Sequence, residues 1–279
     1  KLTHYIKMGY KQCMAALSTI LNKIVRQKLV EIAARKSESP QRRLVQQLDE
    51  APPVRGFFFA LNNCIETGRD AVIAEIKYAS PSVGIIREDF DPIEIAQSYL
   101  EGGAACLSIL TDETFFRGSD AYLKSVRTHC RLPLLRKDFI IDPYQVYEAR
   151  ILGADCILLI VAILSTEKLR DLYALATNLN MDVLVEVHDK AELDIALTLH
   201  NPLIGINNRD LHTFETTLKI TFDLIPHIPK HYLVVTESGI HSREDVDSLR
   251  EHDVNAFLVG EAFMRSVNPG SKIKALFRN

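Results

Sequence analysis

Eight short apolar runs recur along the chain beyond about residue 70, and each has the length of a β-strand. Stretches with helical periodicity, such as residues 165–179 and 190–200, lie between them. Near-continuous runs of Val, Ile and Leu are typical of parallel strands that are buried on both faces. The predicted strands are Ala71–Ile76, Ala104–Leu110, Leu132–Leu135, Asp155–Ala162, Asp182–Val187, Leu203–Asn207, Tyr232–Glu237 and Asn255–Gly260. This alternation predicts an α/β fold of eight βα units.

Capping residues indicate where the helices between the strands begin. Asp91 and Asp142 each precede a proline at the first helical position, and Ser242 precedes a polar first turn. A doubly wound open sheet would also alternate strands and helices, but it more often opens with a glycine-rich first turn. No such turn follows Lys77. We therefore expect a (βα)₈ TIM barrel, which typically takes about 250 residues.

The part of the chain before residue 70 does not join this alternation. Residues 17–36 form an amphipathic helical pattern with Ile20 and Ile24 on its apolar face, and residues 57–61 resume an apolar stripe. We expect one domain over residues 1–279. Its barrel spans about 70–279, a helical extension at about 17–65 lies across one end of the barrel, and residues 1–16 form an extra tail.

Charged and amide side chains follow the apolar runs with unusual regularity. Because all strands of a parallel barrel end on one face, these side chains are expected to converge at its mouth. The strings that carry them are Ala74-Glu75-Ile76-Lys77, Leu135-Arg136-Lys137-Asp138, Leu184-Val185-Glu186-Val187, Gly205-Ile206-Asn207-Asn208-Arg209 and Thr236-Glu237-Ser238-Gly239. Two lysines among glutamates suggest proton transfer around a carbonyl. We expect burial and a second cation to lower the pKa of Lys77 and Lys137 toward the range that suits acid catalysis.

Composition narrows the class of protein further. The formal net charge of −3 argues against a nucleic-acid partner, which normally meets a basic surface. The five cysteines are scattered without a CxxC pair, which favours a reducing cytoplasm. The longest apolar run, residues 156–164, is far shorter than the roughly 20 residues that span a membrane. The nine histidines show no metal-ligand spacing, so neither a metal nor a membrane is expected.

Ordered motifs link the chain to a known family. They are Ile73-Ala74-Glu75-Ile76-Lys77-Tyr78-Ala79-Ser80-Pro81-Ser82, Asp89-Phe90-Asp91-Pro92, Leu107-Ser108-Ile109-Leu110-Thr111-Asp112, Phe116-Arg117-Gly118-Ser119, Arg136-Lys137-Asp138-Phe139, Glu186-Val187-His188, Gly205-Ile206-Asn207-Asn208-Arg209-Asp210-Leu211, Glu237-Ser238-Gly239-Ile240 and Leu258-Val259-Gly260. Over roughly residues 20–275 the chain closely resembles the indole-3-glycerol phosphate synthases, which are (βα)₈ enzymes of tryptophan biosynthesis. Together these motifs are highly specific, although each alone would be moderately so.

The resemblance implies a reaction. The family closes an indole ring on 1-(2-carboxyphenylamino)-1-deoxyribulose 5-phosphate and releases CO₂ and water, with no redox step and hence no cofactor. It implies a phosphorylated small-molecule substrate. We expect a cytoplasmic monomer that makes at most transient contacts with other enzymes of the same pathway.

The resemblance also implies roles for individual residues. Lys137 would be the general acid of the condensation, and Lys77 would contact the substrate carboxylate and could act as an acid later. The other expected members of the catalytic group are Glu186 and Glu75 for dehydration, Asn207 for orientation, and Ser238. Arg209 is expected to bind and steer the anionic substrate. Which lysine and which glutamate serve each step stays open.

The two ends of the substrate would be bound by different loops. Phosphate is expected at Ser238-Gly239 and Gly260-Glu261 in the loops after the last two strands, with the Ser80 hydroxyl contributing. The adjacent Pro81 is expected to contact the substrate. Candidates for the ring pocket are Phe116, Phe139, Leu158, Ile160 and Leu211, although Leu158 and Ile160 could equally be plain barrel core. Glu261 departs from the family, because many relatives have serine there.

Two other classes compete with this interpretation. Phosphoribosylanthranilate isomerase, another phosphosugar barrel, would need a Cys and an Asp at strand ends, but Cys106 and Cys156 lie within the apolar runs. A non-catalytic barrel could keep the phosphate loops. It would have no reason to combine two lysines with two glutamates at the strand ends.

Overall fold

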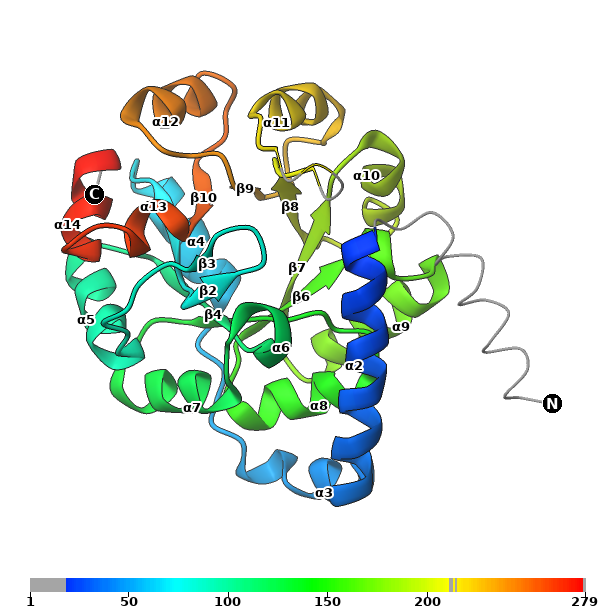
Figure 1. The fold of residues 1–279 in the computed structure, drawn as a ribbon. Helices are drawn as coiled ribbons and strands as arrows, with labels where there is room; N and C mark the ends of the chain where they lie inside the picture. Colours follow the sequence, from blue (N-terminus) through cyan, green and yellow to red (C-terminus); the bar gives the residue numbers. More distant parts are fainter. Residues whose placement is uncertain (1–18, 211–212, 214, 278–279) are drawn as a thin grey trace.

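In the computed structural model, which describes residues 19–210, 213 and 215–277, parallel strands close into an eight-stranded barrel that Figure 1 shows along its axis. In order around the barrel the strands are β1 (Ala71–Ile76), β10 (Ala256–Val259), β9 (Val234–Glu237), β8 (Leu203–Asn207), β7 (Asp182–Val187), β6 (Cys156–Ile160), β5 (Leu134–Lys137) and β4 (Cys106–Leu110). All eight predicted strands are confirmed. The short strands β2 (Ala79–Ser80) and β3 (Gly84–Ile85) pair antiparallel in the loop after β1.

Helices form the outer ring around the strands (Figure 1). They are α5 (Pro92–Gly102), α7 (Asp120–His129), α8 (Pro143–Leu152), α9 (Thr166–Asn178), α10 (Lys190–Ala196), α11 (Lys219–Leu224), α12 (Arg243–Arg250) and α14 (Pro269–Leu276). Shorter helical segments are α6 (Glu113–Phe116), α13 (Glu261–Met264), η1 (Leu48–Glu50), η2 (Val161–Ile163) and η3 (Ile225–His227).

The expected caps begin three of these helices. The Asp91 side chain accepts hydrogen bonds from the backbone of α5, the Asp142 side chain does so for α8, and Ser242 forms a capping box with Asp245 on α12. Because these caps fix where each helix begins, they also fix the length of the loops that line the mouth of the barrel.

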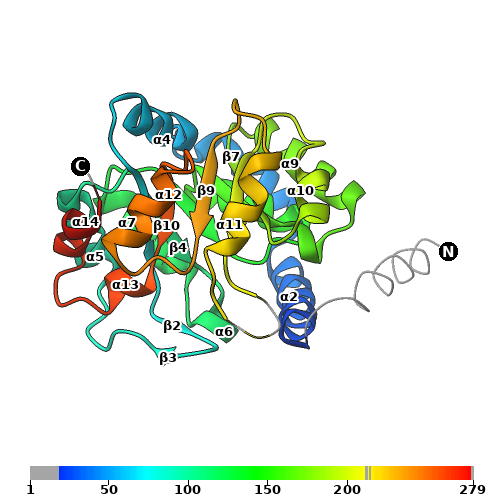
Figure 2. The same ribbon diagram turned by 90° about the horizontal axis from the view of Figure 1, so that it is seen from above.

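The N-terminal extension covers both ends of the barrel, and the expectation of one end is therefore wrong. It consists of α2 (Thr19–Glu38), α3 (Gln41–Gln46) and α4 (Phe57–Glu66). Figure 2 shows α4 at the end opposite to α2, α6 and β3. The Phe58 N–H donates to Asp182 Oδ2 at the start of β7 over 2.9 Å, and the Phe57 side chain is fully buried there. Helical periodicity predicts an apolar face but not which surface that face will meet.

Helix α2 is fixed to the barrel through a buried lysine. Lys28 Nζ lies 2.9 Å from a carboxylate oxygen of each of Glu31, Asp112 and Asp138. Its side chain is 3% exposed, and Asp112 and Asp138 are buried as well. Since Asp112 and Asp138 follow β4 and β5, this ion cluster connects the extension to the loops at the mouth of the barrel.

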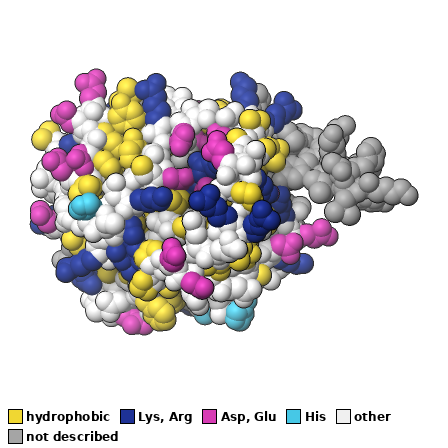
Figure 3. Space-filling view, turned by 90° about the horizontal axis from the view of Figure 1, so that it is seen from below, with side chains coloured by type: hydrophobic (Ala, Val, Ile, Leu, Met, Phe, Trp, Pro, Cys, Tyr) yellow, Lys and Arg dark blue, Asp and Glu magenta, His cyan; other side chains and the backbone are white. Residues whose placement is uncertain are grey.

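The surface carries mixed charge. On the face that Figure 3 shows, groups of Lys and Arg side chains alternate with acidic and apolar ones. Among the described residues, no helix combines the length and the apolar character needed to cross a membrane.

Candidate active site

One cavity at the carboxyl ends of the strands brings the expected residues together. Those that line it are Glu75, Lys77, Ser80, Pro81, Phe116, Lys137, Phe139, Leu158, Ile160, Glu186, Asn207, Arg209, Ser238, Gly239, Gly260 and Glu261. Leu211, the remaining expected residue, lies outside the described residues. The residues come from strands and loops all around the barrel, so only the closed fold places them side by side.

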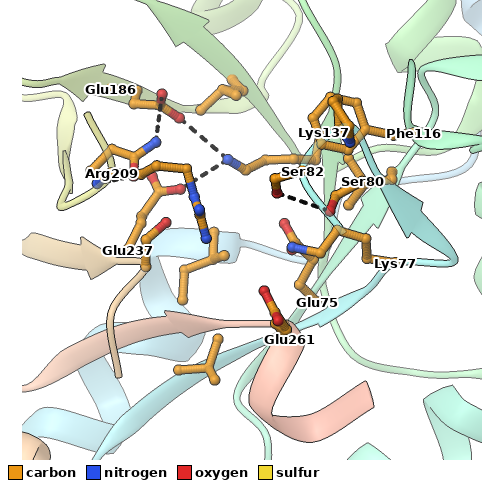
Figure 4. A pocket seen from close by; sticks show the side chains of 18 of the residues that line it. Glu75, Lys77, Ser80, Ser82, Phe116, Lys137, Glu186, Arg209, Glu237 and Glu261 are labelled. Atoms are coloured by element: carbon orange, nitrogen blue, oxygen red, sulfur yellow. Dashed lines mark hydrogen bonds and ion pairs between the residues drawn. The ribbon is translucent and has the colours of Figure 1, made fainter. Parts of the chain in front are cut away.

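Lys137, the last residue of β5, is at the centre of the charged part of the cavity (Figure 4). Its Nζ lies 2.9 Å from Glu237 Oε2 and 3.3 Å from Glu186 Oε2. The Asn207 amide donates to the other oxygen of Glu186 over 3.1 Å. An ammonium group is thus held between two carboxylates from β7 and β9, with one face open to the cavity.

A second lysine–glutamate pair, Lys77 with Glu75, lies at the end of β1. Lys77 Nζ lies 2.7 Å from Glu75 Oε2, and Glu75 is buried. Gly260 of the neighbouring strand end makes room for this carboxylate, since a Cβ there would overlap Glu75 Oε2. Gly205 does the same for Glu237, whose Oε1 would lie 2.7 Å from a Cβ at that position. The absence of a side chain at these two glycines therefore leaves room for the Glu75 and Glu237 carboxylates.

The expected lowering of the pKa of Lys137 is wrong. Burial does lower the pKa, but the carboxylates of Glu237, Glu186 and Glu75 outweigh burial and raise the pKa above its ordinary value. Burial raises the pKa of Glu75, whereas Lys77 and Lys137 outweigh this and leave the pKa below its ordinary value. The cluster therefore holds a firmly protonated lysine, which suits the stabilisation of a developing negative charge.

The two carboxylates that face Lys137 differ from each other. Burial raises the pKa of Glu237 to about 7, and the nearby charges of Glu186 and Glu75 add to the rise although Lys137 opposes it. Burial acts on Glu186 in the same direction, but Lys137, His188 and Asn207 outweigh it and lower its pKa. Sequence reasoning gave Glu237 no role, although it follows an apolar run as the other glutamates do.

The apolar part of the cavity combines barrel and extension residues. The ring centroids of Phe116 and Phe139 lie 6.0 Å apart, and Leu158 and Ile160 of β6 are buried beside the cavity. Phe116 is the last residue of helix α6. Ile20, Leu21 and Ile24 of α2 add a further wall to the cavity, as expected of the apolar stripe around Ile20 and Ile24.

The loops after β9 and β10 form the side of the cavity opposite to Lys137. Ser238 and Gly239 both have a positive φ, at 66° and 78°, which turns successive peptide groups within this loop. At the β2–β3 hairpin, which follows β1, the Ser80 and Ser82 hydroxyl groups lie 3.4 Å apart (Figure 4). Ser82 is a further polar group that sequence reasoning did not assign.

Glu261 is held by its own helix. Its Oε1 lies 3.0 Å from Arg265 Nε and 2.9 Å from Arg265 Nη2, one turn further along the chain. Its charge is therefore partly compensated by a residue outside the catalytic cluster.

We expect Glu261→Ser to change KM by less than about tenfold, the equivalent of 1.4 kcal/mol, and to leave kcat intact. The reason is that the carboxylate pairs with Arg265, so the substrate would meet the backbone of this loop and not the acid. Steady-state kinetics test this, with Arg265→Gln as the matched control that frees the same carboxylate. A large fall in kcat for Glu261→Ser would show that the side chain faces the reacting atoms.

Within the described part of the chain, no three His, Cys, Asp or Glu side chains are grouped so that they could hold a metal ion. The donors around the cavity are lysine ammonium, arginine, imidazole, hydroxyl and amide groups. This set suits an organic anion and proton transfer.

Comparison with known proteins gives one family. The family model described as indole-3-glycerol phosphate synthase matches residues 21–276. An indole-3-glycerol phosphate synthase from Bordetella pertussis (strain Tohama I) is 57% identical over 260 residues, which cover 93% of this chain and 99% of that protein.

Solved structures of other barrels resemble the fold at low sequence identity. KGPDC from Streptococcus mutans has a TM-score of 0.58 at 13% identity, and the match covers 75% of this chain and 95% of that one. The tryptophan synthase alpha subunit from Legionella pneumophila str. Paris has a TM-score of 0.59 at 10% identity, and the match covers 80% and 97%. These likenesses concern the barrel fold alone.

Proposed function

The chain belongs to the indole-3-glycerol phosphate synthase family and is a lyase, and from this premise we propose that its lysine–glutamate cluster carries out the ring closure. The proposed substrate is 1-(2-carboxyphenylamino)-1-deoxyribulose 5-phosphate, and the products are indole-3-glycerol phosphate, CO₂ and water. The observation that carries the proposal is Lys137 Nζ, held between Glu186 and Glu237 at the mouth of the barrel.

In the proposed condensation, the ring carbon that bears the carboxylate attacks the ketone carbon of the sugar chain. Negative charge develops on the ketone oxygen, and the Lys137 ammonium donates a proton to it. The C–CO₂ bond then breaks, and its electron pair restores the aromatic ring. The raised pKa of Lys137 supports this role, because the lysine is fully charged when the oxygen needs stabilisation.

The proposed dehydration needs one acid and one base. Lys77 donates a proton to the departing hydroxyl group, and a carboxylate of the cluster removes a proton from the substrate. Two protons are donated and one is removed, so the ionised substrate takes up one proton overall, as the loss of a carboxylate as CO₂ requires. The Lys77–Glu75 distance of 2.7 Å supports the role of Lys77 as a charged acid that a carboxylate holds in place.

The two ends of the substrate would lie on opposite sides of this cluster. We place the phosphate against the backbone N–H groups of the Ser238–Gly239 and Gly260–Glu261 loops, with Ser80 adding a hydroxyl group. Arg209 points into the cavity from the loop after β8 and would attract the anionic substrate (Figure 4). The aromatic ring would lie against Phe116 and Phe139, beside Leu158 and Ile160.

A direct assay tests the proposal. The purified protein is mixed with the carboxyphenylamino substrate, and we expect indole fluorescence to appear together with one equivalent of CO₂. The same substrate without its phosphate is the control and should react with a much higher KM, because the phosphate loops then bind nothing. Saturable binding of the phosphorylated substrate without fluorescence or CO₂ would favour the non-catalytic barrel instead.

A further inference from the structure

His188 lies directly behind the catalytic cluster, at the end of the strand that carries Glu186. It is the residue that follows β7, and its side chain is 13% exposed. The imidazole lies between two carboxylates: Nε2 is 3.3 Å from Glu186 Oε1, and Nδ1 is 3.0 Å from Glu192 Oε2. Nothing in the proposed mechanism uses this histidine.

Glu192 holds the histidine from the side away from the cavity. Its Oε2 accepts a hydrogen bond from the His188 backbone N–H over 2.8 Å as well as contacting the ring, and Glu192 belongs to α10. The Nε2 contact with Glu186 is an ion pair without an aligned hydrogen bond, because Nε2 has no hydrogen-bond partner among the described residues. The ring is thus anchored at Nδ1 and presents its other nitrogen to Glu186.

The histidine makes the surroundings of Glu186 and Glu237 unequal. Glu186 is contacted by Lys137, Asn207 and His188, which come from β5, β8 and the end of β7. Glu237 shares Lys137 and keeps a buried Oε1 without a hydrogen-bond partner among the described residues. Two carboxylates that share one lysine differ in their tendency to take up a proton when their other contacts differ, and His188 is a contact of Glu186.

We propose that His188, anchored by Glu192, is a positioning residue that keeps Glu186 ionised and oriented toward Lys137, so that Glu237 is the carboxyl group that takes up a proton. This inference rests on the proposed function, because it gives separate tasks to two carboxylates of that site. Glu186 then serves as a fixed anion, and a proton removed from the substrate goes to Glu237 and from there to solvent.

The charge of the histidine is consistent with this arrangement. Burial lowers the pKa of His188, but Glu186 and Glu192 outweigh burial and raise the pKa to about 10. The acidic groups that face the ring are Glu186 on β7 and Glu192 on α10, and Lys137 lies beyond Glu186. His188 is therefore a cation at any pH between about 6 and 8.5.

His188→Gln tests the inference through the pH dependence of kcat. Without the imidazolium, the pKa of Glu186 rises, and at low pH the shared proton is divided between Glu186 and Glu237. We expect a loss in kcat of about threefold at pH ~8.5 and about tenfold or more at pH ~6, since one pKa unit changes the ionised fraction up to tenfold. A merely structural role would give the same fold-loss at both pH values.

Glu192→Gln is the matched second variant, because Glu192 contacts Glu186 through His188. We expect kcat of this variant to fall less than in His188→Gln but with the same pH dependence, so that the loss is again larger at the lower pH. The double variant should lose no more activity than His188→Gln alone. Normal kcat for His188→Gln at the lower pH, equal losses at both pH values, or fully additive losses would each overturn the inference. Glu186→Gln separates this outcome from a failure of the proposed function, since full turnover in that variant would remove the catalytic role of Glu186 itself.

Discussion

Replacing Lys137 with methionine is expected to lower kcat by about 10²-fold or more, as the loss of a general acid commonly does. Methionine keeps most of the length and the apolar stem of the side chain but removes the charge. Glu186 and Glu237, at 3.3 and 2.9 Å from Nζ in the native protein, would then face the ketone oxygen without a cation between them. The effect should lie in kcat, because the proposed phosphate and ring contacts do not involve Lys137.

Steady-state kinetics and a separate binding measurement distinguish these effects. We expect the substrate to bind Lys137→Met within about tenfold of its normal affinity, or 1.4 kcal/mol. Lys124→Met, which changes an exposed lysine on α7, is the control and should behave like the native protein. Near-normal kcat in Lys137→Met would remove the assignment of Lys137 as the acid.

Replacing Lys28 with methionine is expected to destabilise the protein by about 3–5 kcal/mol, the usual cost of removing one partner from a buried ion pair. Asp112 and Asp138 would stay buried, and Asp138 would retain Arg136 at 3.6 Å and the Thr111 hydroxyl at 2.6 Å. At roughly 2–4 °C per kcal/mol for a domain near this size, Tm should fall by about 6–20 °C.

Thermal and urea unfolding measure this change. Lys36→Met is the matched control on the same helix, because Lys36 pairs with Asp142 at 2.8 Å but is 39% exposed. An exposed pair of this kind is worth at most about 1 kcal/mol. Equal losses of stability in the two variants would mean that Lys28 anchors α2 no more strongly than a surface lysine does.

The barrel could be predicted because its strands are buried on both faces. Segments such as Ala71–Ile76 and Cys156–Ile160 have no exposed side chain, so their sequences are almost entirely apolar. The position of the extension could not be predicted in the same way. The apolar residues around Phe57 and around Ile20 look alike in sequence, yet they cover opposite ends of the barrel.

The candidate site was predictable to the extent that it depends on strand ends. Lys77, Lys137, Glu75 and Glu186 follow directly from that rule, and the same rule also points to Glu237. The direction in which the pKa of Lys137 shifts could not be predicted from the sequence, because it depends on how many carboxylates lie within a few ångströms in the folded chain. His188 could not be recognised either, since its position behind Glu186 arises from the contact with Glu192 on α10.

Helix α4 has its partner far along the chain, and this bears on the order in which the protein can assemble during synthesis. Phe58 and the Asp182 carboxylate that accepts from its N–H are separated by 124 positions. A ribosome that adds about 5–20 residues per second takes roughly 6–25 s to cover that distance. Phe57 and Leu61 are both fully buried in the finished barrel. Throughout this interval the strands that bury them have not all been synthesised. The nascent chain must therefore carry an apolar helix whose docking site does not yet exist, which makes it a natural client for a chaperone.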